Sequence, residues 1–156
     1  GCNDIDDNAR CDSPYLFVNN QDTYPFTNEN GWQPNIELSG TASFGNSLNL
    51  TVWDINHPNQ PYILALSDAN QPGITLANGL TVPLYGGPIF FLTLFYGPAV
   101  GLSNNIGVLD SNGRASVQFN VPIPGLQGLV LYSAFVTGDN GGNIVDVSPP
   151  YSFIIS

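Results

Sequence analysis

Alternation of apolar and polar side chains is the clearest pattern in the chain, and it is strongest around residues 106–121. After Asp110-Ser111-Asn112-Gly113, apolar residues occupy every second position from Ala115 to Val121, as on a strand with one buried face. Asp at the first position and Asn-Gly at the end are typical of a tight turn. The sequence therefore predicts a β-hairpin here. Residues 129–136 are apolar on both faces, which predicts a central strand of a two-layer sheet.

Further strand patterns recur along the chain, separated by turn residues. Asn78-Gly79 favours a two-residue hairpin. Apolar residues nowhere recur at helical spacing for three turns, and 17 Gly and 13 Pro supply turn signals. The pattern predicts an all-β fold, a two-layer antiparallel β-sandwich of Ig-like/Greek-key or jelly-roll type, with roughly eight to ten strands. The additional segments expected as strands are residues 36–39, 47–52, 62–66, 74–76, 80–84, 89–96, 144–145 and 151–155.

The first 35 residues lack this regular pattern and are rich in Asp. We therefore divide the chain into an N-terminal arm, residues 1–35, and a sandwich domain, residues 36–156. Two interpretations of the arm remain open. It either packs across one end of its own sandwich or leaves that domain to complete another subunit.

Charge narrows the choice of partners. Only 9 % of the residues are charged, Lys is absent, and the net charge is −10. Nucleic acids and anionic membrane surfaces require clustered cations, so both are disfavoured. The longest apolar run is far shorter than the roughly 20 residues of a membrane-spanning helix. These features favour an extracellular or cell-surface protein.

Cys2 and Cys11 are the two cysteines, and their short spacing predicts a disulfide in an oxidising compartment. Bridges to a neighbouring subunit are the alternative. Asn49-Leu50-Thr51 matches the N-glycosylation sequon, and the strand pattern places Asn49 on an outward face.

Oxygen-bearing side chains alternate near the N-terminus as they do in calcium loops. Ala9 stands where an EF-hand has glycine, and Tyr15 stands where it has the bidentate Glu. The segment is therefore either a solvated acidic turn or a calcium site, and calcium is the one cofactor that the sequence suggests. The candidate ligands are Asp4, Asp6, Asn8 and Asp12.

Catalysis would depend on His57, the single histidine, or on a perturbed carboxylate. His57 lies in an Asn-His-Pro-Asn loop with Asp54 nearby, which is typical of a solvated turn. The chain contains no G-x-S-x-G, no H-E-x-x-H and no glycine-rich phosphate loop. We expect no enzymatic activity and assign no catalytic residue.

Residues of the 106–131 segment carry a resemblance to a known type of module. The "LD-x-x-G-x-A" turn and the following "P-x-P-x-L-x-G-x-x-L" run resemble a β-sandwich module of large secreted proteins of planctomycete-type environmental bacteria. The likeness covers about residues 40–156 and implies an extracellular accessory or structural module without a known active site. The matching residues are Leu109, Asp110, Gly113, Ala115, Pro122, Pro124, Leu126, Gly128 and Leu131.

The aromatic segment 88–96 suggests how the protein assembles. As a strand it would place Ile89, Phe91 and Phe95 on one face and Phe90, Leu92, Leu94 and Tyr96 on the other, so both faces would be apolar. One face would pack on the core, and the second would be covered either by the arm or a loop, or by a neighbouring subunit. Residues Tyr15, Leu16, Phe17 and Val18 could pair as a strand with a neighbour's sheet.

The sequence therefore favours an extracellular, pilus-like structural subunit that self-assembles into a filament or surface layer. The alternative is a carbohydrate-binding or adhesion module, in which aromatic side chains would stack on a polysaccharide. The stacking candidates are Trp32, Trp53, Tyr62, Tyr85 and Tyr96.

Overall fold

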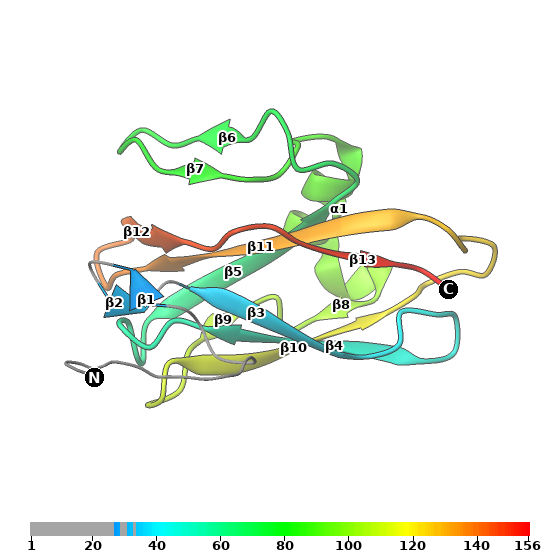
Figure 1. Cartoon of the computed structure of the whole chain (residues 1–156), viewed down its shortest axis with the longest axis horizontal. Helices are drawn as coiled ribbons and strands as arrows, with labels where there is room; N and C mark the ends of the chain where they lie inside the picture. The colour runs from blue at the N-terminus through cyan, green and yellow to red at the C-terminus, as the bar shows by residue number, and fades with distance from the viewer. Residues whose placement is uncertain (1–26, 29–30, 33) are drawn as a thin grey trace.

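Two antiparallel sheets form the body of the molecule (Figure 1). The computed structural model describes residues 27–28, 31–32 and 34–156. The four-stranded sheet has the order β3-β4-β10-β8, and the five-stranded sheet has the order β12-β11-β5-β9 with β13 also pairing with β11. The prediction of an all-β antiparallel sandwich is confirmed. The strands of the first sheet are β3 (Asn35–Gly40), β4 (Ser47–Trp53), β10 (Arg114–Asn120) and β8 (Leu102–Ser103). Those of the second are β12 (Ile144–Val147), β11 (Val130–Gly138), β5 (Pro61–Ser67), β9 (Ile106–Val108) and β13 (Tyr151–Ile154).

The four-stranded sheet follows the predicted alternation. Leu48, Leu50 and Val52 of β4 face the core, and Val117 and Phe119 of β10 are buried with them. Leu50 lies directly opposite Val117 in the ladder. Since opposite residues share a face, one hydrophobic side of this sheet forms half of the main core.

The central strand β11 is covered on both faces, as its sequence predicts. Leu131 and Phe135 belong to the core between the sheets. Ala134 lies on the outer face, in a smaller apolar cluster that also contains Val82 and Leu84. The cover on that outer face includes the hairpin of β6 (Ile74–Thr75) and β7 (Thr81–Val82), which matches the Asn78-Gly79 prediction.

The predicted hairpin around residues 110–113 is wrong, although its turn is present. The backbone N–H of Gly113 donates to the carbonyl of Asp110 at 3.0 Å, as expected for a tight turn. However, β9 pairs with β5 and β10 pairs with β4 and β8, so the turn joins two different sheets. The physical reason is that turn chemistry fixes local geometry but does not choose the partner of each strand.

The prediction of a strand over residues 88–96 is also wrong. This segment is the helix α1 (Pro88–Tyr96), followed by the 3₁₀ helix η1 (Gly97–Val100). Pro88 begins the helix, a position where its missing N–H costs no hydrogen bond. Nine nearly uniformly apolar residues fit both strand and helix periodicity, so the pattern alone could not decide between them.

Polar side chains explain why α1 packs beside β5. β9 covers only the first part of β5. Beyond it, Asn105 Nδ2 donates to the carbonyl of Leu64 at 3.2 Å, and Thr93 Oγ1 accepts from the N–H of Leu66 at 3.0 Å. Thr93 is the buried residue of α1. Asn105 Nδ2 also donates to the backbone carbonyl of Thr93, at 2.9 Å. Side chains thus replace the hydrogen bonds of a missing neighbouring strand.

Several predictions concern residues that the structure does not describe. The disulfide of Cys2 and Cys11, the calcium ligands Asp4, Asp6, Asn8 and Asp12, and the interface residues Tyr15, Leu16, Phe17 and Val18 all lie outside the described residues. Within the arm the structure describes β1 (Thr27–Asn28) paired with β2 (Gly31–Trp32), and the sandwich begins with β3.

Candidate functional site

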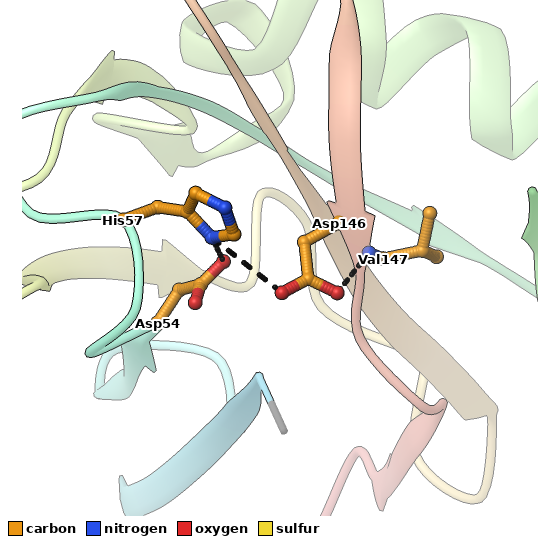
Figure 2. A network of polar contacts seen from close by, with 4 residues as sticks. All are labelled: Asp54, His57, Asp146 and Val147. Carbon is orange, nitrogen blue, oxygen red and sulfur yellow. Dashed lines mark hydrogen bonds and ion pairs between the residues drawn. The ribbon is translucent and has the colours of Figure 1, made fainter. Parts of the chain in front are cut away.

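Three ionisable side chains meet at one end of the sandwich: Asp54, His57 and Asp146 (Figure 2). Asp54 directly follows β4, His57 lies in the connection to β5, and Asp146 belongs to β12. The cluster therefore joins the end of one sheet to an edge strand of the other.

The turn at residues 110–113 holds Asp54 in place. The Asp54 N–H donates to the Gly113 carbonyl at 2.7 Å, and the Asp54 carbonyl accepts from the His57 N–H at 3.0 Å. A Cβ on Gly113 would lie 2.4 Å from the Asp54 carbonyl oxygen, and Gly113 has a φ of +77°. Glycine is required here on both counts. The Asp-Ser-Asn-Gly turn predicted from sequence thus positions the site.

Asp146 reaches the cluster through its register in the sheet. It lies opposite Thr137 of β11, next to a register shift between Thr137 and Gly138. Its backbone neighbour Val147 donates an N–H to Asp146 Oδ1 at 3.1 Å. The other carboxylate oxygen, Oδ2, lies on the side of His57 (Figure 2).

His57 Nδ1 faces both carboxylates. It lies 3.0 Å from Asp54 Oδ2, within hydrogen-bond distance, and 3.6 Å from Asp146 Oδ2. The Asp54 side chain is fully buried, while the side chains of His57 and Asp146 are 30 % and 27 % exposed. The site is thus closed on the Asp54 side and accessible on the other.

The electrostatics of the cluster are those of two carboxylates forced together. Burial and the nearby Asp54 carboxylate together raise the pKa of Asp146 to about 6, while the Val147 N–H and His57 oppose the change. Removing water from a carboxylate and placing a like charge beside it both disfavour ionisation. The pair therefore favours anything that supplies positive charge.

Four buried side-chain oxygens near this end have no hydrogen-bond partner in the described part of the chain. They are Asp54 Oδ1, the hydroxyl of Thr137 opposite Asp146, Gln60 Oε1 just before β5, and Asn35 Oδ1 opposite Trp53. Buried polar atoms are normally paired, so an unpaired carboxylate oxygen in a charged cluster calls for a physical explanation.

A shallow depression of about 470 Å³ opens beside His57. It is lined by polar loop residues on both sides of the cluster, so a small polar molecule could reach His57 from solvent. The lining residues are Asn56, His57, Pro58, Gln60, Asp139, Asn140 and Gly141.

Only part of this site is predictable from the sequence. The sequence places His57 near Asp54 but predicts a solvated loop, whereas His57 is half-buried and paired with Asp54. Asp146 was not predicted, and its one signal is a carboxylate inside the apolar run Ile-Val-Asp-Val. Asn49 is half-buried on β4, and its glycosylation stays a prediction.

A second candidate surface lies on α1. Phe91, Leu92, Phe95 and Tyr96 are 49 %, 46 %, 67 % and 63 % exposed, whereas Phe90 and Leu94 are half-buried. The predicted grouping of Phe90, Leu92, Leu94 and Tyr96 on one face is therefore wrong, because helical geometry replaces strand geometry. Phe91 and Phe95, one helical turn apart, stack in parallel with centroids 6.1 Å apart. We call Phe91, Leu92, Phe95 and Tyr96 the α1 patch.

The aromatic residues suggested for polysaccharide stacking fall into different environments. Tyr62 is buried in the core, so its assignment as a stacking residue is wrong. Tyr85 and Tyr96 are exposed, and Trp53 is half-buried beneath Arg114, whose guanidinium lies 4.7 Å from the ring centroid. Trp32 lies in β2, where only the backbone is described.

Comparison with known proteins yields structural likeness only. No protein-family model matches the chain, and no curated protein matches it. Two solved structures match in part. The D0–D1 domain of intimin matches with a TM-score of 0.37 and 16 % identity, over 76 % of this chain and 46 % of that chain.

The second is a C-terminal 282-residue fragment of intimin in complex with the intimin-binding domain of the translocated intimin receptor. It matches with a TM-score of 0.32 and 16 % identity, over 76 % of this chain and 33 % of that chain. The chain thus spans less than half the length of either structure. Among the described residues, no helix has the length and apolarity needed to span a membrane.

Proposed function

We propose that this chain is a non-catalytic, extracellular β-sandwich subunit that associates with further copies of itself through the α1 patch. The observation that carries the proposal is that four large apolar side chains of α1 are exposed together. A contiguous apolar surface of this kind usually marks a contact with another molecule.

The lack of charged residues on α1 favours an apolar occupant, and a second α1 patch is one such surface. The chain carries a net charge of −10, yet α1 contains no Asp, Glu, Lys or Arg. The patch therefore offers nothing to a charged partner. A second α1 patch is complementary to it without any charge pairing, as in a two-fold symmetric contact between identical surfaces.

The magnitude limits what the α1 patch can do alone. Full burial of a large apolar side chain contributes about 1.5–3 kcal/mol, and these four are already about half buried. Their remaining exposure is worth roughly 3–7 kcal/mol per copy by the same scale, and a symmetric contact buries two such patches, roughly 7–14 kcal/mol together. Association itself costs about 4–15 kcal/mol in lost freedom, which offsets most of this gain. We therefore expect weak pairing, and a filament or surface layer would require a further contact per subunit.

The experiment is sedimentation velocity of the full chain over a wide concentration range. The unchanged chain should show a concentration-dependent increase in mass, and Phe95→Ser should abolish it. Ile123→Ser is the matched control, because Ile123 is 55 % exposed outside α1. A chain that stays monomeric throughout, or equal association of both variants, would contradict the proposal.

The exposed rings of Tyr85 and Tyr96 favour the second candidate, a polysaccharide-binding or adhesion module, since exposed aromatic faces can stack on sugar rings. In that case Tyr85→Ala should reduce retention of the chain on insoluble polysaccharides, while Ile123→Ser should not. Equal retention of these two variants would count against it.

A further inference from the structure

The Asp54–His57–Asp146 cluster has the composition of a metal site. It offers one imidazole nitrogen and two carboxylate oxygens, and one atom from each residue lies within 4.8 Å of the others. Imidazole combined with carboxylate is a donor set that suits Zn²⁺ and its neighbours among the divalent transition metals. His57 lies in the loop before β5, so the cluster is at the N-terminal end of that strand. In contrast, α1 contacts Leu66 near the C-terminal end of β5. The inference is therefore independent of the proposed self-association.

The spacing of the donors agrees with a shared ion. Zn²⁺ bonds of about 2.0–2.1 Å in tetrahedral geometry place neighbouring ligand atoms roughly 3.4 Å apart. The two separations from His57 Nδ1, 3.0 Å to Asp54 and 3.6 Å to Asp146, lie on either side of this value. The two carboxylates lie within 4.8 Å of each other, so they would have to approach by at most about 1.4 Å to share one tetrahedral ion.

Burial supplies the second and independent observation. Asp54 is a fully buried side chain whose Oδ1 has no hydrogen-bond partner among the described residues. A buried carboxylate next to a second carboxylate is costly when its charge is not compensated. A divalent cation would neutralise both carboxylates and would give the free oxygen a partner, either directly or through a bound water.

We propose that Asp54, His57 and Asp146 bind one Zn²⁺-like divalent transition metal ion. Three protein ligands leave one coordination position of a tetrahedral ion for water or a small anionic ligand. The depression beside His57 gives that position access to solvent. Because Asp54 follows β4 and Asp146 belongs to β12, the ion would also cross-link the two sheets at this end.

Isothermal titration of the EDTA-stripped full chain with Zn²⁺ tests the proposal. His57→Gln and Asp146→Asn each remove one ligand from a partly exposed position, so both should fold. Asp68→Asn is the matched control. It makes the same change of charge at an exposed position that follows the far end of β5, away from the cluster and from the depression.

The unchanged chain and Asp68→Asn should bind Zn²⁺ alike. His57→Gln and Asp146→Asn should each lose one ion per chain or bind it at least ~10–100-fold more weakly, the loss that removal of even an outer-shell partner causes. Co²⁺ in place of Zn²⁺ should give the visible absorption bands of a tetrahedral site in the unchanged chain. His57→Gln and Asp146→Asn should not show these bands. No Zn²⁺ binding by the unchanged chain, or equal binding by all four proteins, would overturn the proposal.

Discussion

The hydroxyl of Thr93 should be a disproportionate source of stability. Thr93 is buried in α1, and its Oγ1 accepts from the Leu66 N–H at 3.0 Å. The same hydroxyl can donate to the carbonyl of Leu66 at 3.2 Å or of Phe90 at 3.1 Å. Thr93→Val keeps the shape of the side chain and removes both interactions, so it tests this contact without opening a cavity.

The magnitude follows from what is left behind. The Leu66 N–H would stay buried without a partner, which costs about 1–3 kcal/mol, and the donated hydrogen bond adds about 0.5–1.5 kcal/mol. Thr93→Val should therefore lower the free energy of unfolding by roughly 2–4 kcal/mol. Thr93→Ser keeps the hydroxyl and loses one methyl group, which is worth about 0.8 kcal/mol in transfer free energy.

Urea denaturation followed by tryptophan fluorescence measures this difference. The order of stability should be unchanged chain, then Thr93→Ser, then Thr93→Val, with similar dependence on urea concentration. Thr75→Val is the control, since Thr75 is an exposed threonine of the β6–β7 hairpin. If Thr93→Val proved as stable as Thr93→Ser, the hydroxyl would not be what attaches α1 to β5.

Three further predictions use the same denaturation assay. Gly101→Ala should lower the free energy of unfolding more than Gly125→Ala does. Both glycines have φ near +90°, which costs an alanine ~1–2 kcal/mol, but only at Gly101 would the new Cβ also clash with a backbone oxygen, that of Asn120. Equal losses of stability would mean that this clash is relieved at no cost. Arg114→Gln should cost ~0.5–1 kcal/mol by removing the cation that lies over the Trp53 ring, and an unchanged midpoint would exclude that contribution. The pKa of Asp110 is lowered, chiefly by the N–H of Arg114, so its stabilising contribution is present above the ordinary value of 3.8 and is lost as pH falls through the lower folded-state value. In Asp110→Asn, the free energy of unfolding should therefore fall less steeply with decreasing pH in this range than in the unchanged chain. An equal fall in both proteins would contradict this role of Asp110.

Much of the fold follows from period-two patterning. The buried positions of β4 and β10 are the apolar ones predicted, because each of these strands has one face toward the core and one toward solvent. α1 was not predictable in the same way, because its apolar residues fit either period. Its place in the fold involves the contact of Thr93 with Leu66, a residue distant in sequence, which no local pattern predicts.

The candidate site shows a similar division. The turn that holds Asp54 is legible in the sequence, since Asp-Ser-Asn-Gly has few alternatives to a tight turn. The approach of Asp146 to His57 is not, because it depends on which sheet each strand joins and on the register of β12 against β11. No local pattern contains that information.

The pairing of β4 with β10 and of β5 with β11 has a consequence for how the molecule forms. Each ladder joins segments that lie far apart along the chain. Such contacts require a large loss of loop entropy before they contribute, which slows the search for the native topology. During synthesis β3 and β4 can pair early, but the apolar face of β5 must wait until β11 has emerged from the ribosome. We therefore expect folding to be slow. Its rate should be limited by the pairing of β11, in the last third of the chain, with β5.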